Sequence, residues 1–415
     1  MKPILISLAR GCKTVYGRFE QNVNIATADD ICEALSSGPI KKQEDPKREK
    51  QSIKMLIHEI IFIMIVTTIQ ISTTCHADPT NETINNASMF PAILVFGDST
   101  IDTGNNNYIN TIIRANFPPY GCNFPGHHAT GRFSNGRLIP DFIASLMGIK
   151  DTVPPFLDPH LSDSDILTGV CFASAGSGYD NYTDLATLSL SVDKQADMFR
   201  SYMARLSRIV GDEKAAKIVS EALVIVSSGT NDFDINLYDM PSPRIKLGVE
   251  GYQDFILSGV HNFVQELYDI GCRKIMVLGL PPIGCLPVQM TFARQKQNER
   301  RCIDKQNSDS QEYNQKLKKS LTDIQSNLTG SVIFYADIYG TILDMATNPQ
   351  SYGIKETTRG CCGTGELELS YLCNPLTRTC PDANDYLFWD DIHPTQRAYL
   401  VVSLSLVDQI LHVLQ

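Results

Sequence analysis

The sequence lacks an excess of basic residues, an internal repeat, and any apolar run of the length that a membrane-spanning helix needs. Among its 415 residues, 36 are Lys or Arg and 46 are Asp or Glu, which gives a net charge of −10 at pH 7. Because binding to nucleic-acid phosphates needs a basic surface, we expect no nucleic-acid partner. With 43% hydrophobic and 20% charged residues, the composition excludes a disordered chain and a polytopic membrane protein. The sequence therefore predicts an ordinary globular protein.

The charge is unevenly distributed, and the first part of the chain differs from the rest. Residues 1–54 carry 10 basic and 7 acidic residues, whereas the remainder carries 26 and 39. An apolar run of about a dozen residues then ends in small residues at Ala77, as in a secretory signal peptide, whereas a membrane span needs about 20. We expect Met55 to be the true start, so that 1–54 is a non-native or disordered extension. A signal peptide over 55–77, cleaved after Ala77, and a short linker over 78–90 would follow; a signal anchor or a buried helix is the alternative.

Cysteine is abundant beyond this predicted cleavage point. The nine cysteines there are Cys122, Cys171, Cys272, Cys285, Cys302, Cys361, Cys362, Cys373 and Cys380. Their density indicates an oxidising compartment, and the crowding within 361–380 predicts a loop closed by disulfides. A zinc site is the alternative for this loop, although adjacent cysteines suit tetrahedral ligation poorly and no C-x2-C pair is present. Because nine is odd, at least one thiol has no partner within this part of the chain. The candidate N-glycosylation sites are Asn81, Asn86, Asn181 and Asn327.

Short β-branched runs alternate with amphipathic helical stretches from about Pro91 onward. The candidate strands are 92–96, 169–173, 222–226, 274–278 and 332–335. Helical patterns lie near 137–147, 193–209, 250–270, 308–328 and 395–414. This alternation predicts a parallel sheet covered by helices on both faces. We therefore expect residues 91–415 to form one α/β domain.

Small and polar residues follow three of the predicted strands, namely Ser99, Gly176 and Asn231. An open parallel sheet binds its ligands at these carboxyl ends. Near the end of the chain, Asp390 precedes His393 by three residues, so its carboxylate can hold the imidazole Nδ1–H while Nε2 accepts a proton. A serine after a strand is most often a helix cap, and an Asp-x-x-His sequence is most often a turn. Together, however, these residues supply the nucleophile, base, carboxylate and oxyanion donors that acyl transfer requires.

Other residues could fill some of these positions. Asp391 is the alternative to Asp390 as the orienting carboxylate. The other histidines considered as the base are His127, His128 and His160. We expect these three to be surface residues, because they lie in polar or proline-containing loops without a carboxylate at triad spacing. An α/β-hydrolase lipase is excluded, because its Gly-x-Ser-x-Gly nucleophile motif is absent from the chain.

Nine sequence blocks occur in one order along the chain. They are Val95–Ser99, Asp102–Asn107, Phe117–Gly121, Thr130–Arg137, Phe172–Gly178, Gly229–Asp232, Leu280–Cys285, Cys361–Gly363 and Asp390–Thr395. In these blocks, from Phe90 to the C-terminus, the chain resembles the plant GDSL esterase/lipase family of the SGNH hydrolase superfamily.

The resemblance implies a fold, an activity and a set of site residues. The fold would be three-layer α/β/α with a flavodoxin-like, five-stranded parallel sheet, and the reaction would be carboxylic ester hydrolysis without a metal or an organic cofactor. Ser99 matches the nucleophile, His393 the base and Asp390 the acidic residue of the family's triad. The oxyanion donors would be the backbone N–H groups of Ser99 and Gly176 and the side-chain amide of Asn231.

We accordingly expect a secreted, monomeric esterase or lipase of the apoplast or cell wall, without a stable membrane span. Its substrate would be an acyl lipid, a small acyl ester or an acylated polysaccharide. The alternative function is that of a catalytically silent secreted binding protein that retains the hydrolase fold.

Two residues depart from the family pattern. Thr100 follows the nucleophile where many members have Leu or Ile, and we expect its hydroxyl to cap the next helix without affecting the reaction. Cys171 stands where Asn is common; we expect it to be buried and unpaired, and to support Gly176 slightly less firmly than Asn would. Cys285 and Cys302, which lie close together in one insertion, are the expected disulfide pair.

Substrate choice should depend on three insertions, around 105–135, 232–250 and 345–385. The acidic balance disfavours tight binding to anionic membranes or pectin, and no long amphipathic lid helix is evident. We therefore expect esters of short to medium acyl chains.

Overall fold

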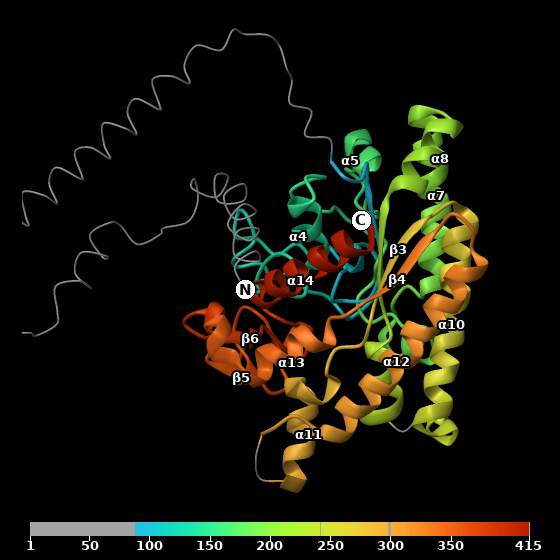
Figure 1. Ribbon diagram of the computed structural model, residues 1–415. Helices are drawn as coiled ribbons and strands as arrows, with labels where there is room; N and C mark the ends of the chain where they lie inside the picture. Colours follow the sequence, from blue (N-terminus) through green and yellow to red (C-terminus); the bar gives the residue numbers. More distant parts are fainter. Residues whose placement is uncertain (1–87, 241, 298–299, 415) are drawn as a thin grey trace, which may run out of the picture. The chain divides into compact units, whose positions relative to one another are not determined.

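The computed structural model describes residues 88–240, 242–297 and 300–414 (Figure 1). The predicted extension and signal peptide, and all but the last three residues of the predicted linker, lie outside the described residues. The candidate glycosylation sites Asn81 and Asn86 lie outside them too. Of the other two sites, Asn181 is exposed at the start of a helix and Asn327 is exposed at the end of another.

A parallel sheet forms the centre of the domain. Its strands, in the spatial order β1-β2-β3-β4, are β1 (Ile93–Gly97), β2 (Leu223–Ser227), β3 (Lys274–Leu278) and β4 (Val332–Ala336). Every residue of β1 and β2 is buried. Continuous apolar runs of this kind are expected where both faces of a sheet are covered, which confirms the predicted α/β class.

The segment 169–173, predicted as a full strand, is instead a short extended segment between β1 and residues 154–156. It forms one parallel bridge between Val95 and Cys171, supported by a hydrogen bond of 2.7 Å from the Phe172 N–H to the Val95 carbonyl. Pairing is short because Gly169 has a φ of +91°, where a Cβ atom would lie 1.9 Å from the Ile93 carbonyl oxygen. The sheet thus has four regular strands plus this segment, and counting the segment gives the flavodoxin-like order 2-1-3-4-5.

Helices cover both faces of the sheet. The helices are α4 (Ile139–Leu146), α5 (Asp163–Thr168), α6 (Asn181–Thr187), α7 (Val192–Val210), α8 (Asp212–Glu221), α9 (Thr230–Phe233), α10 (Gly248–Ile270), α11 (Pro287–Gln297), α12 (Asp304–Asn327), α13 (Tyr339–Thr347) and α14 (Gln396–Leu414). Figure 1 shows α4, α13 and α14 on one side of the strands and α7, α8, α10 and α12 on the other. The predicted three-layer architecture is therefore confirmed.

The helix α7 illustrates how the local sequence forms these layers. The Ser191 side chain accepts a hydrogen bond from the Lys194 N–H and caps the helix start, and Gly211 ends the helix with a φ of +83°. Phe199, Tyr202 and Leu206 recur at helical spacing and are buried. The Phe199 ring lies 5.4 Å from the ring of Phe96 in β1, centroid to centroid, so this face of the helix packs on the sheet.

One helix of the described residues, α14, is long and apolar enough to cross a membrane by length and composition. Its residues Tyr399, Val402 and Leu406 are buried, and the helix packs against α4 and α13. We therefore interpret α14 as a helix of the domain core, which passes the same composition test.

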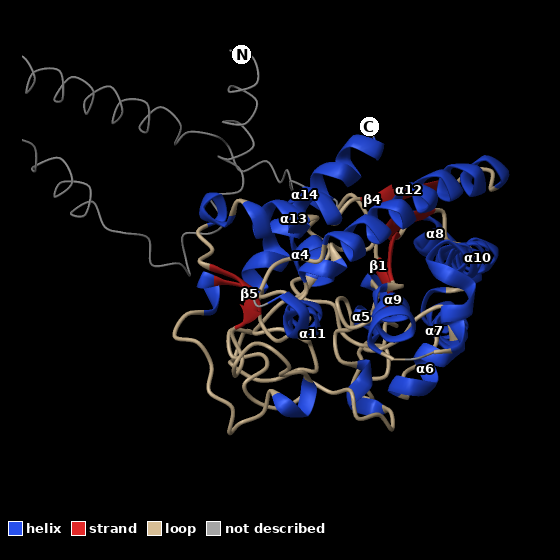
Figure 2. Ribbon diagram, turned by 90° about the horizontal axis from the view of Figure 1, so that it is seen from below, coloured by secondary structure: helices blue, strands red, loops and turns tan. Residues whose placement is uncertain are grey.

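A smaller region with two disulfides adjoins this domain core. It contains the two-stranded parallel sheet of β5 (Glu356–Gly360) and β6 (Tyr386–Phe388), and Figure 2 shows loop segments gathered beside β5 and α11. The disulfides in the described residues are Cys361–Cys380, Cys362–Cys373 and, elsewhere, Cys285–Cys302. The loop 361–380 is therefore closed by disulfides, and its adjacent cysteines are not thiolate ligands for zinc. Among the residues that the structure describes, three cysteines are free, namely Cys122, Cys171 and Cys272.

Candidate functional site

Ser99 lies in the tight turn that follows β1. Gly97 ends the strand with a φ of +142°, and a Cβ atom there would lie 1.8 Å from the Ser227 carbonyl oxygen, so only glycine fits. The Asp98 N–H donates to the same carbonyl at 2.9 Å, and the Asp102 N–H donates to the Asp98 carbonyl at 2.9 Å. These bonds fix the turn at the carboxyl end of the sheet, where Ser99 is 7% exposed.

Two backbone donors near Ser99 have no acceptor. Among the residues that the structure describes, neither the Ser99 N–H nor the Gly176 N–H makes a hydrogen bond. Gly176 has a φ of +89°, and a Cβ atom there would lie 2.7 Å from the Thr187 Cβ. Since buried backbone N–H groups are nearly always paired, these two donors are suited to a ligand's oxygen atom.

Three polar residues hold the segment that leads to Gly176. Asn105 donates from Nδ2 to the carbonyls of Cys171 and Ala173, at 2.9 and 2.8 Å. Asn106 Nδ2 donates to the Ala175 carbonyl at 2.9 Å, and Asp102 Oδ2 accepts from the Ala175 N–H at 3.0 Å. Sequence analysis identified these residues as part of a block without assigning them a role. The sequence feature that could have identified this role is the run of asparagine residues shortly after the predicted nucleophile.

Asn231 lies in the first turn after β2, within α9. Its Nδ2 donates one hydrogen bond of 2.9 Å to the Ser177 carbonyl, which leaves the second N–H of that amide for a ligand. The next residue, Asp232, is buried and accepts hydrogen bonds from the Tyr179 and Asp180 N–H groups. The loop after Gly176 is therefore tied to α9 through Asp232.

Asp390 and His393 form a buried pair in the loop between β6 and α14. The imidazole Nδ1 lies 2.8 and 2.9 Å from the two carboxylate oxygens of Asp390, and the His393 N–H donates to Asp390 Oδ1 at 2.6 Å. The His393 Nε2 is buried without a hydrogen-bond partner. The geometry is that of an oriented base, with Nδ1–H held by the carboxylate and Nε2 available.

Tyr120 is a further support of this pair that sequence analysis missed. Its hydroxyl donates to Asp390 Oδ2 at 2.9 Å and accepts from the Ser370 N–H at 3.0 Å. Burial, followed by the charge of Asp390, raises the pKa of Tyr120 well above its usual value, so the hydroxyl stays a donor. Only its place in the block Phe117–Gly121 marked it in the sequence.

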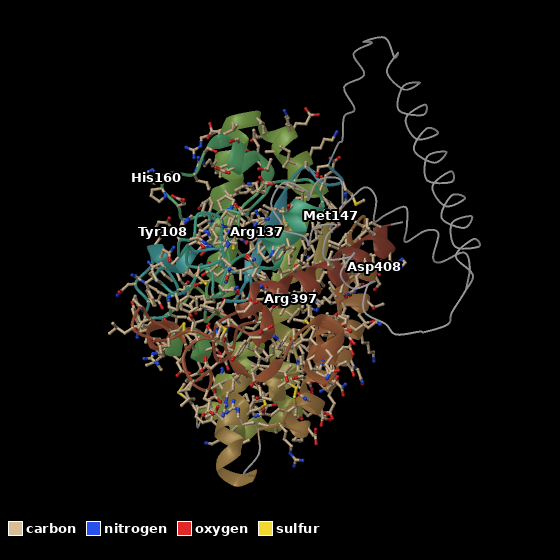
Figure 3. All side chains as sticks on the ribbon, turned by 90° about the vertical axis from the view of Figure 1, so that its left-hand side faces the viewer. Tyr108, Arg137, Met147, His160, Arg397 and Asp408 are labelled. Atoms are coloured by element: carbon tan, nitrogen blue, oxygen red, sulfur yellow. A yellow bond between two sulfur atoms is a disulfide. The ribbon has the colours of Figure 1, made fainter. Side chains whose placement is uncertain are left out.

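The residues considered as alternatives for the carboxylate and the base do not take part in this arrangement. Asp391 makes no hydrogen bond to His393 among the described residues. The histidines His127, His128 and His160 are exposed, and Figure 3 shows His160 at the edge of the molecule.

The two departures from the family pattern have structural explanations. No helix directly follows Ser99, so Thr100 is not a helix cap as expected. Its hydroxyl instead donates to Asp98 Oδ1 at 2.7 Å and lies 3.1 Å from the Ser227 hydroxyl. Cys171 is buried and free, with its thiol 3.2 Å from the Ile101 carbonyl. Asn105, and not a residue at position 171, provides the side-chain amide that supports this segment.

A cavity of about 680 Å³ brings the separate parts together. Ser99, Gly176, Asn231 and His393 all line it. Its other walls come from the three insertions expected to affect substrate choice, from α6 and α11, and from the loop between β6 and α14. They consist of Ile112, Ile113, Thr187, Asp234, Ile235, Asp239, Met240, Val288, Phe292, Leu367, Leu369, Ser370, Tyr371, Leu372, Asp391 and Ile392. The lining is mainly apolar, as expected for a site that accommodates an acyl chain.

Carboxyl groups near the cavity have raised pKa values. Burial raises the pKa of Asp98 to about 6. Its hydrogen bonds with Thr100 and the electrostatic effect of His393 partly oppose this increase. Burial, followed by the charges of Asp239, Asp391 and Asp98, raises the pKa of Asp234 well above its usual value. Burial and the charge of Asp390 do the same for Asp391. Burial thus makes each of these groups harder to ionise than an exposed aspartate.

Comparison with known proteins places this arrangement among ester hydrolases. Residues 93–406 match the model of the GDSL-like lipase/acylhydrolase family. A GDSL esterase/lipase of Arabidopsis thaliana is 83% identical over 360 residues, which is 87% of this chain and 100% of the relative. Two further Arabidopsis thaliana GDSL esterase/lipases are 53% and 52% identical over 342 residues, 82% of this chain and 94% of each relative.

Proposed function

Since the chain belongs to the GDSL-like lipase/acylhydrolase family and is a carboxylic ester hydrolase, we propose that it is a secreted, monomeric serine esterase. Ser99 is the nucleophile, His393 the base and Asp390 its orienting carboxylate. The N–H groups of Ser99 and Gly176 and the amide of Asn231 bind the oxyanion. The alternative, a catalytically silent binding protein that retains the hydrolase fold, would hydrolyse no more ester than Ser99→Ala in the assay described below.

Acylation begins when His393 Nε2 takes the proton of the Ser99 hydroxyl. The Ser99 Oγ attacks the ester carbonyl, and the negative charge develops on the carbonyl oxygen. Three donors aimed at that oxygen stabilise the tetrahedral intermediate, and the loss of one typically costs about 3–4 kcal/mol in the transition state. The intermediate collapses as His393 gives its proton to the departing alcohol oxygen, which leaves the acyl group on Ser99.

Deacylation repeats these steps with water in place of the alcohol. His393 removes a proton from water as the water oxygen attacks the acyl-enzyme, and it returns the proton to Ser99 Oγ as the acid leaves. Asp390 stabilises the imidazolium in both halves of the reaction. Its two oxygens together receive the Nδ1–H, two backbone N–H groups and the Tyr120 hydroxyl, so it stays fixed throughout.

One observation carries the proposal. His393, whose buried Nε2 has no partner among the described residues, lines the same cavity as Ser99 and Gly176, although these residues come from distant parts of the sequence. A buried nitrogen without a partner is costly in a structural histidine. It is expected in a base that awaits its substrate.

The test is hydrolysis of p-nitrophenyl acetate and butyrate by the wild type and by Ser99→Ala and His393→Ala. We expect each variant to lose at least about 10⁴-fold in kcat, because the groups of such a triad act as a unit. His160→Gln is the matched control, since it changes an exposed histidine and should retain wild-type kcat. If Ser99→Ala releases phenolate as fast as the wild type, the proposed mechanism is wrong.

We also infer that the chain is exported after removal of a signal peptide over 55–77. The nine cysteines that follow and the exposed sequons at Asn181 and Asn327 support this inference. The length of 360 residues over which the 83% identical relative matches is close to that of the chain from Met55 onward. N-terminal sequencing of protein secreted by plant cells should give Asp78 as the first residue. An N-terminus before Met55 would contradict the inference.

A further inference from the structure

Three carboxyl groups, Asp234, Asp239 and Asp391, line one part of the cavity, which we call the acidic corner. Asp234 and Asp391 are 4% and 3% exposed, respectively. Asp234 Oδ2 and Asp391 Oδ1 are buried and have no hydrogen-bond partner among the described residues. Unsatisfied buried oxygens of this kind are rare in folded proteins and usually indicate a missing partner.

The protein itself provides little to satisfy the acidic corner. No Lys or Arg is among the described residues that line the cavity. Gln289 is the nearest polar support: its Nε2 donates to Asp239 Oδ1 at 2.7 Å and lies 3.4 Å from Asp234 Oδ1. This contact leaves the second oxygen of Asp234 without a partner. The acidic corner therefore fits a ligand that carries hydrogen-bonding groups.

The acidic corner and His393 line the same cavity. Asp391 is two residues before His393, and the charges of Asp391 and Asp98 both act on Asp234. The departing alcohol oxygen must lie at His393 Nε2, which gives it a proton. The apolar walls around Ile113 and Leu369 are left for the acyl chain.

We propose that the acidic corner binds free hydroxyl groups on the alcohol part of the ester, so that partial esters of polyols are the preferred substrates. This inference rests on the proposed function, because it requires Ser99 and His393 to act on the same bound ester.

A hydroxyl ligand suits these groups better than a cation. Burial and neighbouring carboxylates raise the pKa values of Asp234 and Asp391, so both act against ionisation of these groups. A protonated carboxyl both donates and accepts hydrogen bonds, as a hydroxyl does. An uncharged carboxyl gives an ammonium group little electrostatic attraction.

The first test compares glyceryl 1-butyrate with propyl butyrate, which has the same carbon skeleton without the two free hydroxyls. We expect the wild type to show a kcat/KM at least about tenfold higher for the glyceryl ester. Asp391→Leu and Asp234→Leu should each lower this ratio toward one. Asp391→Asn should retain part of it, because an amide still bonds to hydroxyls.

A second test does not depend on how much of each variant folds. The acyl group on Ser99 can pass to an added alcohol: the alcohol oxygen forms the new ester bond, the bond to Ser99 Oγ breaks, and His393 carries the alcohol proton to Oγ. With p-nitrophenyl butyrate and equal glycerol and 1-propanol, the wild type should form more glyceryl butyrate than propyl butyrate. Asp391→Leu should lose this preference, and a product ratio is independent of the active fraction.

The matched control is Ile113→Ala, which alters an apolar wall. It should change the dependence of kcat/KM on acyl length but keep the glyceryl-to-propyl ratio. A ratio in Asp391→Leu and Asp234→Leu within about twofold of the wild type would overturn the inference. The wild type could instead prefer butyrylcholine over glyceryl butyrate, and these variants could lose that preference. This result would overturn the inference in favour of a cation site. Failure of the proposed function is distinct, since Ser99→Ala would then still cleave both esters.

Discussion

At the scale of single residues, the buried polar groups of the site differ in the number of hydrogen bonds that they make. Asp390 receives donors on both oxygens, whereas His393 Nε2 has none among the described residues. In the proposed mechanism, this contrast separates Asp390, which stays fixed, from His393, which exchanges protons. Tyr120 and Asp98 extend this pattern, the first through a hydrogen bond to Asp390 and the second through an unpartnered oxygen beside Ser99.

Tyr120→Phe should lower kcat by about three- to tenfold with little change in KM, because Asp390 loses one neutral donor. A carboxylate with fewer donors holds the imidazolium more strongly, so the acid limb of the pH–kcat profile should move to higher pH. Steady-state kinetics from pH 5 to pH 9 would measure both effects. Tyr268→Phe, which removes a surface hydrogen bond to the Thr329 carbonyl, is the control. A lower melting temperature with an unchanged profile would show that Tyr120 has only a structural role.

Asp98→Asn should change how stability depends on pH. Burial raises the pKa of Asp98 from 3.8 to about 6. Between these values the group ionises in the unfolded chain but not in the folded protein, so ionisation favours unfolding as pH rises. From pH 4 to pH 7 the wild type should lose about 2.4 kcal/mol through this group, and the loss is nearly complete above its folded pKa.

The Asn side chain can still accept the two hydrogen bonds from Thr100, since both reach the same oxygen of Asp98. Urea unfolding at several pH values should therefore show that the advantage of Asp98→Asn over the wild type grows with pH. Asp197→Asn, on an exposed carboxylate, is the control. A constant difference between Asp98→Asn and the wild type would contradict this prediction.

At the scale of elements, the loops shape the cavity and the strands fix where the loops begin. Strands β1 and β2 end in turns that hold Ser99 and Asn231, while the loop 361–380 contributes the wall from Leu367 to Leu372. Most of this wall lies inside the 11-residue span closed by Cys362 and Cys373. The disulfide therefore links the stability of the domain to the shape of its substrate cavity.

Replacing Cys362 and Cys373 together by Ala should lower the free energy of unfolding by about 2–3 kcal/mol, the range expected for a loop of this length. The apolar wall should also become less ordered, so kcat/KM should fall more for p-nitrophenyl octanoate than for the acetate. Urea unfolding and the two assays measure these effects. Cys122→Ala is the control, because Cys122 is exposed and free. Equal losses on both esters would mean that the disulfide does not shape the acyl site.

At the scale of the whole molecule, a buried arginine joins segments that the sheet alone does not connect. Arg132 forms two hydrogen bonds, of 2.8 and 2.7 Å, with the carboxylate of Asp141 in α4. It also donates to the carbonyls of Thr103 and Val153. Arg132 therefore connects the block after Ser99, the loop before α4 and the loop after it.

Arg132→Gln should lower the free energy of unfolding by about 3–5 kcal/mol, because it leaves the carboxylate of Asp141 buried without its cation. Arg200→Gln removes two ion pairs at the surface, with Asp197 and Glu266, and should cost about 1 kcal/mol or less for each. Chemical denaturation of both variants gives the comparison. Similar losses in the two variants would show that burial of the Arg132 pair does not matter.

Much of the fold could be predicted from the sequence, because it depends on local patterns of residues. Four of the predicted strands and all five predicted helices are present, since continuous apolar runs and 3.6-residue periodicity reflect the burial of their own residues. The strand predicted at 169–173 was reduced to a bridge by the close approach of Gly169 to Ile93, a contact between segments far apart in the chain. The helix expected after Ser99 is absent for a similar reason, because Thr100 bonds to Asp98 and Ser227.

The sequence by itself determined the residue types of the site and the order of the elements, because motifs and periodicity are local properties of the chain. Only the tertiary structure decided which groups share a space. It brought His393, whose pairing with Asp390 their spacing predicts, into one cavity with Ser99 and Asn231. It also brought Tyr120 to the same carboxylate. Such contacts arise from folding of the entire chain, and no local pattern encodes them.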